Sequence, residues 1–245
     1  MRNKLILFKN HDHCAVKKPT LTVVMIHGIA SESSTYNGAL EYLEKVDALK
    51  NVRFVTFDLL GSGKSLKDDN LNYDYKDQLT ALHNAIKKLK VKTPLVLVGH
   101  SLGTFIVTRY ASKHKKMVRN LILISPPIYT LTDLDNPAFA AGIKAFQDAV
   151  SLKNRQILEE KSFNNSMKRI VLNRKNYQTL AELDIPITLV YGELDKLIAP
   201  YNIPKIKKNN HNIKAVKTAG RHGVSREKYP VLKKLLEEIL KEVEC

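Results

Sequence analysis

The pentapeptide Gly99-His100-Ser101-Leu102-Gly103 is the clearest place in this sequence where chemistry could occur. It follows an apolar, β-rich run and precedes a segment compatible with a helix. A serine at such a strand-to-helix turn has a strained backbone, and flanking glycines let the strand and the helix approach each other. The positive end of the helix dipole favours negative charge that develops nearby. We therefore expect Ser101 to be a nucleophile; the simpler alternative is a serine that only caps the helix.

Several further motifs occur along the chain: HG at 27–28, DLLGSGKS at 58–65, YGELDKLIAP at 191–200 and GRHG at 220–223. Together with GHSLG they make the chain resemble the α/β-hydrolase family, from about Leu21 to the C-terminal helix. The resemblance implies a mainly parallel sheet flanked by helices. It also implies a serine hydrolase whose catalytic serine, acid and histidine follow in that order.

A serine hydroxyl needs a base to take its proton at neutral pH. Of the eight histidines, the family order leaves His211 and His222. His211 lies in the segment KKNNHN, which is typical of a solvated loop. His222 lies just after a strand-like run, where a loop can return to Ser101. We expect His222 to be the base, with His211 as the alternative.

A third group must hold the imidazole in one tautomer and stabilise its charged form. Asp195 follows the strand-like run ITLVY, which matches the acid loop of the family. Glu193 is the local alternative, although it could be a solvated loop carboxylate. Asp184 precedes the strand and would lie at the opposite edge of the sheet. We expect Asp195 to orient His222.

Acyl transfer also needs hydrogen-bond donors where negative charge develops on the carbonyl oxygen, each worth about 2.7–4 kcal/mol. The backbone N–H of Leu102, the residue after the nucleophile, is one expected donor. His27-Gly28-Ile29 resembles the HG-x motif of the family, which makes the N–H of Ile29 the second. His27 is expected to orient this loop rather than to transfer protons. Four nearby residues should either line the entrance or lie in a polar, solvated loop: Ser31, Ser33, Ser34 and Tyr36.

The segment Gly61-Ser62-Gly63-Lys64-Ser65 resembles part of a phosphate-binding loop. The full pattern G-x-x-x-x-G-K-[ST] would require a glycine where the chain has Asp58. The same residues match D-x-x-G-x-G-x-S, a structural turn of the α/β-hydrolase family. We expect the turn rather than a nucleotide site.

Short apolar runs that alternate with longer amphipathic segments must position these groups. The strand-like runs cover residues 21–26, 52–57, 95–98, 121–124, 187–191 and 213–217. Four of them are nearly continuous in apolar residues, as in strands covered by helices on both faces. Residues 75–89, 102–114 and 225–243 are typical of helices. This alternation predicts an α/β domain with a mainly parallel sheet.

The alternation stops between Pro126 and Glu182, where helix-like segments occur without a convincing strand. The stretch is too long for a simple connection. We expect residues 126–182 to form a small helical cap over the carboxyl edge of the sheet. Residues 1–125 and 183–245 would then form the core domain.

The composition is typical of a globular protein, with 44% hydrophobic and 26% charged residues. Its formal net charge of +16 is spread along the chain and is expected mainly to cover solvated faces. Contact with an anionic lipid surface stays open. No nucleic-acid partner is expected, because the chain lacks tryptophan and an aromatic-rich basic stripe. Two cysteines, Cys14 and Cys245, and the lack of a long apolar segment predict a soluble, cytoplasmic protein.

These residues predict hydrolysis of a carboxylic ester, or a related acyl compound, through an acyl-enzyme on Ser101, as in a carboxylesterase or lipase. No metal or organic cofactor is implied. A thioesterase and an aminopeptidase that releases N-terminal proline are alternatives on the same three side chains. An alternative of another class is a non-catalytic binding module with a basic surface, which the intact set of catalytic side chains disfavours.

The aminopeptidase would need carboxylates in the cap to bind the ammonium group of its substrate. Residues 151–175 carry seven basic side chains against two acidic ones, which favours anionic substrates or an anionic surface somewhat more. The basic residues are Lys153, Arg155, Lys161, Lys168, Arg169, Arg174 and Lys175, and the acidic ones are Glu159 and Glu160.

Overall fold

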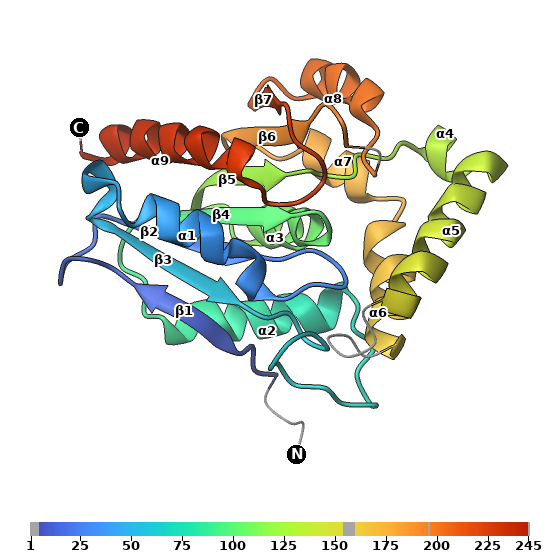
Figure 1. Cartoon of the computed structure of the whole chain (residues 1–245), viewed down its shortest axis with the longest axis horizontal. Coiled ribbons are helices and arrows are strands. Elements are labelled where there is room, and N and C mark those ends of the chain that lie inside the picture. Colours follow the sequence, from blue (N-terminus) through green and yellow to red (C-terminus); the bar gives the residue numbers. More distant parts are fainter. Residues whose placement is uncertain (1–4, 154–159, 196, 245) are drawn as a thin grey trace.

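The computed structural model describes residues 5–153, 160–195 and 197–244, with the side chains of 149–153 left out. Seven strands form one sheet in the order β1-β3-β2-β4-β5-β6-β7 (Figure 1). Strand β1 pairs with β3 in antiparallel orientation, and all the other pairs are parallel. The strands are β1 (Lys9–His13), β2 (Leu21–Ile26), β3 (Val52–Phe57), β4 (Leu95–His100), β5 (Val118–Ile124), β6 (Ile187–Gly192) and β7 (Ile213–Thr218).

The central strands are buried on both faces, as their apolar runs predict. Every residue of β2 and β4 is buried. Alternate side chains of these strands point to opposite sides of the sheet. Val24 and Leu97 belong to one apolar cluster, whereas Val23 and Val96 belong to the other. The predicted fold class, a mainly parallel sheet flanked by helices, is confirmed.

Strand β1 was missing from the sequence prediction. Its residues, KNHDH, are polar and carry no apolar alternation. The strand forms because its backbone pairs with β3, and the Arg53 guanidinium donates to both oxygens of Asp12 at 2.7 and 2.9 Å. A bidentate pair of this kind fixes geometry as well as adding stability.

Helices cover both faces of the sheet (Figure 1). Helices α1 (Asn37–Leu43) and α9 (Tyr229–Glu244) contribute to the apolar cluster on one face. Helices α2 (Tyr75–Lys88), α3 (Leu102–Lys113) and α8 (Ile203–Asn209) contribute to the cluster on the other. Helix α2 begins where the Asp74 carboxylate accepts the N–H groups of Lys76 and Asp77. Short 3₁₀ turns occupy Ser33–Tyr36, Asp47–Leu49, Pro200–Asn202 and Arg226–Lys228.

The described residues between β5 and β6 contain several helices joined by short loops, and no strand. They include α4 (Leu131–Leu134), α5 (Pro137–Lys153), α6 (Glu160–Ser166), a π-helical turn (Met167–Val171) and α7 (Asn176–Ala181). Helices α5 and α6 lie beyond the carboxyl ends of the strands (Figure 1), whereas α7 packs against α3 and α8. The division into a core domain and a cap over 126–182 stays a prediction.

In the described ranges, none of the helices combines the length and apolarity needed to cross a bilayer. Cys14 carries a free thiol, and Cys245 lies outside the described residues.

Candidate active site

Ser101 lies between β4 and α3 with φ +50° and ψ −117°, a backbone conformation that costs energy for a residue with a side chain. Its side chain makes no capping hydrogen bond to α3, so the capping alternative does not hold. The flanking glycines are needed for close packing. A Cβ on Gly103 would lie 2.2 Å from the carbonyl oxygen of Ile26, and one on Gly99 would lie 2.6 Å from that of Gly103. The backbone thus presents the Ser101 hydroxyl at a strained turn.

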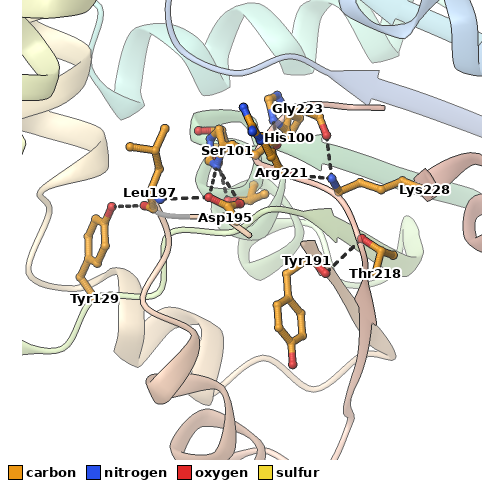
Figure 2. Close-up of polar contacts among 12 residues, drawn as sticks. His100, Ser101, Tyr129, Tyr191, Asp195, Leu197, Thr218, Arg221, Gly223 and Lys228 are labelled. Atoms are coloured by element: carbon orange, nitrogen blue, oxygen red, sulfur yellow. Dashed lines mark hydrogen bonds and ion pairs between the residues drawn. The ribbon is translucent and has the colours of Figure 1, made fainter. Parts of the chain in front are cut away.

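Asp195 and His222 form a hydrogen-bonded pair. The Nδ1–H of His222 donates to the Asp195 carboxylate, with distances of 2.9 and 3.0 Å to its two oxygens. The carboxylate also accepts the Leu197 N–H at 3.0 Å (Figure 2). Burial raises the pKa of Asp195, but the hydrogen bond and charge of His222 outweigh burial and hold this pKa below its usual 3.8. In the neutral ring, this tautomer leaves Nε2 free to accept a proton.

The pairing of β6 with β7 brings the acid and the histidine together. The two strands pair from Ile187–Ile213 to Gly192–Thr218, so the loops that follow β6 and β7 leave the sheet side by side. A Cβ on Gly192 would lie only 1.9 Å from the carbonyl oxygen of Gly220. Close backbone approach at this glycine therefore lets the two loops meet directly after the strands.

Ser101 and His222 line the same cavity of about 330 Å³. Its described lining is largely apolar. Helix α5 contributes four residues spaced at i, i+3, i+4 and i+7, which is one face of a helix. The lining residues besides Ser101 and His222 are Ile29, Pro127, Tyr129, Phe139, Gly142, Ile143, Phe146, Met167, Val171, Leu197, Ile198, Ala199 and Tyr201.

Tyr129 joins this wall to the acid loop. Its hydroxyl donates to the Leu197 carbonyl at 2.8 Å (Figure 2), and its ring packs edge-on against Phe139 with centroids 4.7 Å apart. Sequence reasoning did not find the wall, although the spacing of Phe139, Ile143 and Phe146 was a visible signal.

The two expected oxyanion donors lie beside the nucleophile. Leu102 is the first residue of α3, where a backbone N–H has no acceptor within the helix. Ile29 lines the cavity with Ser101, and a Cβ on the neighbouring Gly28 would lie 3.0 Å from the Cβ of Ser101. The roles of the Ile29 and Leu102 N–H groups remain predictions.

His27 holds the loop that carries Ile29. Its buried ring donates from Nδ1 to the Gly28 carbonyl at 2.7 Å and accepts the Leu59 N–H at Nε2, at 2.9 Å. Burial lowers the pKa of His27, so the ring is neutral and can play both parts. His27 thereby joins the Gly28–Ile29 backbone to the segment after β3.

The expectation for Ser33 and Tyr36 was wrong, because both are buried and hydrogen-bonded within the core. Ser33 donates to the Asp58 carboxylate from its N–H, at 2.8 Å, and from its hydroxyl. The Tyr36 hydroxyl donates to the Ile26 carbonyl at 3.0 Å. Both buried residues form hydrogen bonds with partners that are distant in sequence. Local composition does not reveal such partners.

The GSGKS segment folds around a carboxylate of the chain itself. The Asp58 side chain is buried and accepts the Lys64 N–H at 2.9 Å as well as both groups of Ser33. An N–H of the turn that could bind phosphate is thus occupied by an internal anion. This geometry is that of a structural turn.

The alternative acids and base lie elsewhere. His211 is exposed in the turn before β7, at the amino end of the strand that His222 follows. Glu193 is exposed and pairs with Lys217 at 3.6 Å. Asp184 is exposed before β6 and accepts from Asn212. None of the three is among the described residues that line the cavity.

The described basic residues of 151–175 lie outside the cavity, whose described lining contains neither lysine nor arginine. Arg174 pairs with Asp135 at 2.6 Å, Arg169 lies 3.7 Å from Asp74, and Lys161 donates to the Asp69 carbonyl. Arg155 and Glu159 lie outside the described residues, as does the side chain of Lys153. Contact with an anionic lipid surface stays an open alternative to a solvated face.

A family model described as alpha/beta hydrolase fold matches residues 22–173, which is more than half of the chain. The protein therefore belongs to the α/β-hydrolase fold family. In the described part of the chain, no group of three or more histidine, cysteine, aspartate or glutamate side chains is placed to hold a metal ion.

Among individual proteins, the chain is 35% identical over 123 residues to probable lysophospholipase BODYGUARD 2 of Arabidopsis thaliana, covering 50% of this chain and 26% of the plant protein. It is 22% identical over 224 residues to Lipase 1 of Psychrobacter immobilis, covering 76% and 66%. A bromoperoxidase structure from Bacillus anthracis superposes with a TM-score of 0.72 at 20% identity, covering 96% and 95%. An esterase structure from Exiguobacterium antarcticum gives 0.72 at 17% identity, with the same coverage. At such identities the two structures show a shared fold.

Proposed function

We propose that the protein is a serine hydrolase that cleaves carboxylic esters with an apolar acyl group, in the manner of a carboxylesterase or lipase. The observation that carries this proposal is the hydrogen-bonded pair of Asp195 and His222. His222 lines the same largely apolar cavity as Ser101, whose backbone is strained. The backbone conformation of Ser101 costs energy. Together with the acid and the histidine, this serine forms the constellation that nucleophilic acyl transfer requires.

The reaction proceeds in two stages. Nε2 of His222 takes the hydroxyl proton of Ser101 as the serine oxygen attacks the ester carbonyl. The N–H groups of Ile29 and Leu102 stabilise the negative oxygen of the tetrahedral intermediate. His222 then gives its proton to the departing alcohol, which leaves an acyl-enzyme. Water attacks the acyl group by the same route and restores the serine.

Asp195 acts on the ring rather than on the substrate. Its carboxylate accepts the Nδ1–H of His222, which fixes the tautomer and stabilises the imidazolium that forms in each stage. The lowered pKa of Asp195 keeps it ionised throughout the neutral range, so it can counter that charge.

The cavity favours an apolar acyl group. Burial of each methylene contributes about 0.8 kcal/mol, and the described lining offers aromatic, aliphatic and methionine side chains to an alkyl chain. The names of the relatives, a lysophospholipase and a lipase, also support an ester of a fatty acid. A proline-releasing aminopeptidase would need a carboxylate for the substrate ammonium, and the described lining supplies none. A thioesterase uses the same acyl chemistry and is the closest competitor.

Labelling with a fluorophosphonate tests the class of the protein. We expect wild type to be labelled and Ser101→Ala to remain unlabelled, with an unchanged melting temperature as the control for folding. A folded wild type that does not label would favour the non-catalytic binding module. Turnover of p-nitrophenyl esters, an acyl thioester and a prolyl amide then ranks the substrate classes, and faster turnover of the thioester or amide would overturn the ester assignment.

A further inference from the structure

The loop that carries His222 is held by a buried lysine. Lys228 is wholly buried directly before α9, and its ammonium donates to the carbonyls of Arg221 and Gly223 at 2.6 and 2.8 Å (Figure 2). These two residues flank His222 directly. A buried ammonium without partners would be strongly unfavourable, so the loop and the lysine satisfy each other.

A second side chain, that of His100, fixes the carbonyl of His222, which lies between those of Arg221 and Gly223. His100 donates from Nε2 to the carbonyl oxygen of His222 at 2.8 Å. Burial and the nearby His222 lower the pKa of His100 to about 3, so its ring stays neutral and keeps this tautomer. The carbonyls of residues 221, 222 and 223 are therefore each fixed by a side chain anchored in the core.

This loop needs external support. Its sequence, Gly220-Arg221-His222-Gly223, contains two glycines, which restrict the backbone least. The carbonyls of Arg221, His222 and Gly223 bond to side chains rather than to a helix or a strand ladder. A displacement of about 1 Å in a catalytic group can lower a rate about 100-fold.

We infer that Lys228 and His100 are positioning residues that hold the backbone of His222 in the geometry for proton transfer with Ser101. The inference rests on the proposed hydrolase function for its kinetic consequence. The titratable groups around His222 are Asp195 after β6, His100 at the end of β4, and Lys228 with Glu227 before α9.

The kinetic test replaces Lys228 with methionine, which keeps the length of the side chain but removes its charge and donors. We expect kcat for a p-nitrophenyl ester to fall roughly 10- to 100-fold while KM stays within about twofold, because Lys228 does not line the cavity. Lys234→Met, on the exposed side of α9, is the matched control and should leave both kcat and KM unchanged.

A merely structural lysine would lower the amount of folded protein without changing kcat per folded molecule, and that result would overturn the inference. If Lys228→Met does not fold, Lys228→Gln takes its place, since its amide can still donate to a carbonyl but carries no charge. A folded variant with wild-type kcat would equally refute the role.

Proton NMR separates this inference from the proposed function. The Nδ1–H signal of His222, identified by its loss in His222→Ala, should be sharp in wild type and broadened or absent in Lys228→Met. This signal reports the position of the ring even if wild type shows no fluorophosphonate labelling, the outcome that counts against the hydrolase. An unchanged His222 signal in the lysine variant would overturn the positioning role.

Discussion

Gly142 offers a way to rebuild the cavity wall without disturbing the rest of the protein. It lies on the face of α5 that lines the cavity, and a Cβ there would have no heavy atom within 4 Å. Gly142→Leu therefore introduces a side chain into open space. Leucine is also a better helix former than glycine, by about 0.8–1 kcal/mol, so α5 should not be weakened.

The size of the effect follows from the space removed. A leucine side chain carries four carbons and should displace about four methylenes of a long acyl chain. At about 0.8 kcal/mol for each methylene, the loss is roughly 3 kcal/mol, or about 100- to 200-fold in kcat/KM. An acetyl ester, which is too short to reach this wall, should be hydrolysed at the wild-type rate.

The assay compares kcat/KM for p-nitrophenyl esters from acetate to decanoate in wild type, Gly142→Leu and Ala141→Leu. Ala141 is exposed on the same helix and is not among the described lining residues, so its variant is the matched control. The expected outcome is a profile shifted to shorter chains in Gly142→Leu alone. An equal loss for every ester, or an unshifted profile, would refute the assignment of this cavity to the acyl chain.

Four other predictions concern the acid, the base and the turn after β3. Asp195→Asn should lower kcat by about 10⁴, because an amide no longer fixes the tautomer of His222; a loss below tenfold would contradict that role. The Asp195–His222 pair should stabilise the fold above about pH 4, since a carboxyl with a lowered pKa loses this contribution as pH falls through its folded value. Urea unfolding of wild type and Asp195→Asn across pH 2–6 should show the difference shrink in acid. His222→Ala should abolish turnover and His211→Ala should preserve it, and the reverse would reassign the base. Asp58→Ala should cost roughly 2–5 kcal/mol in urea unfolding, because the donors of Ser33 lose a buried charged acceptor.

Much of the sheet was predictable because its strands are buried on both faces and so have nearly continuous apolar sequences. The runs at 21–26 and 52–57 coincide with β2 and β3, and the other four lie within one to three residues of the observed strands. The turn at Ser101 was predictable for a different reason, since a serine flanked by glycines directly follows a strand-like run and precedes a helix-like run. Asp195 and His222 were predicted because each follows a strand-like run and matches a motif of the α/β-hydrolase family.

The features that sequence did not predict depend on distant partners. Strand β1 is polar and forms through its pairing with β3. Ser33 lies in a polar segment typical of a solvated loop, but it is buried and donates to Asp58. Lys228 lies in the charged segment Arg-Glu-Lys, typical of an exposed face, yet its side chain is enclosed because it meets two loop carbonyls. In each case the partner becomes a neighbour only through the tertiary fold.

The sheet topology places the expected nucleophile, Ser101, far along the chain from Asp195 and His222. The region that matches the family model, residues 22–173, contains Ser101 but stops before β6 and β7, which carry the acid and the histidine. Contacts so far apart in sequence form slowly, because a long segment of chain must be closed before they are made. A refolding molecule should therefore regain most of its helical circular dichroism before it regains the proposed hydrolase activity. The delay between the two signals would time the docking of the last two strands.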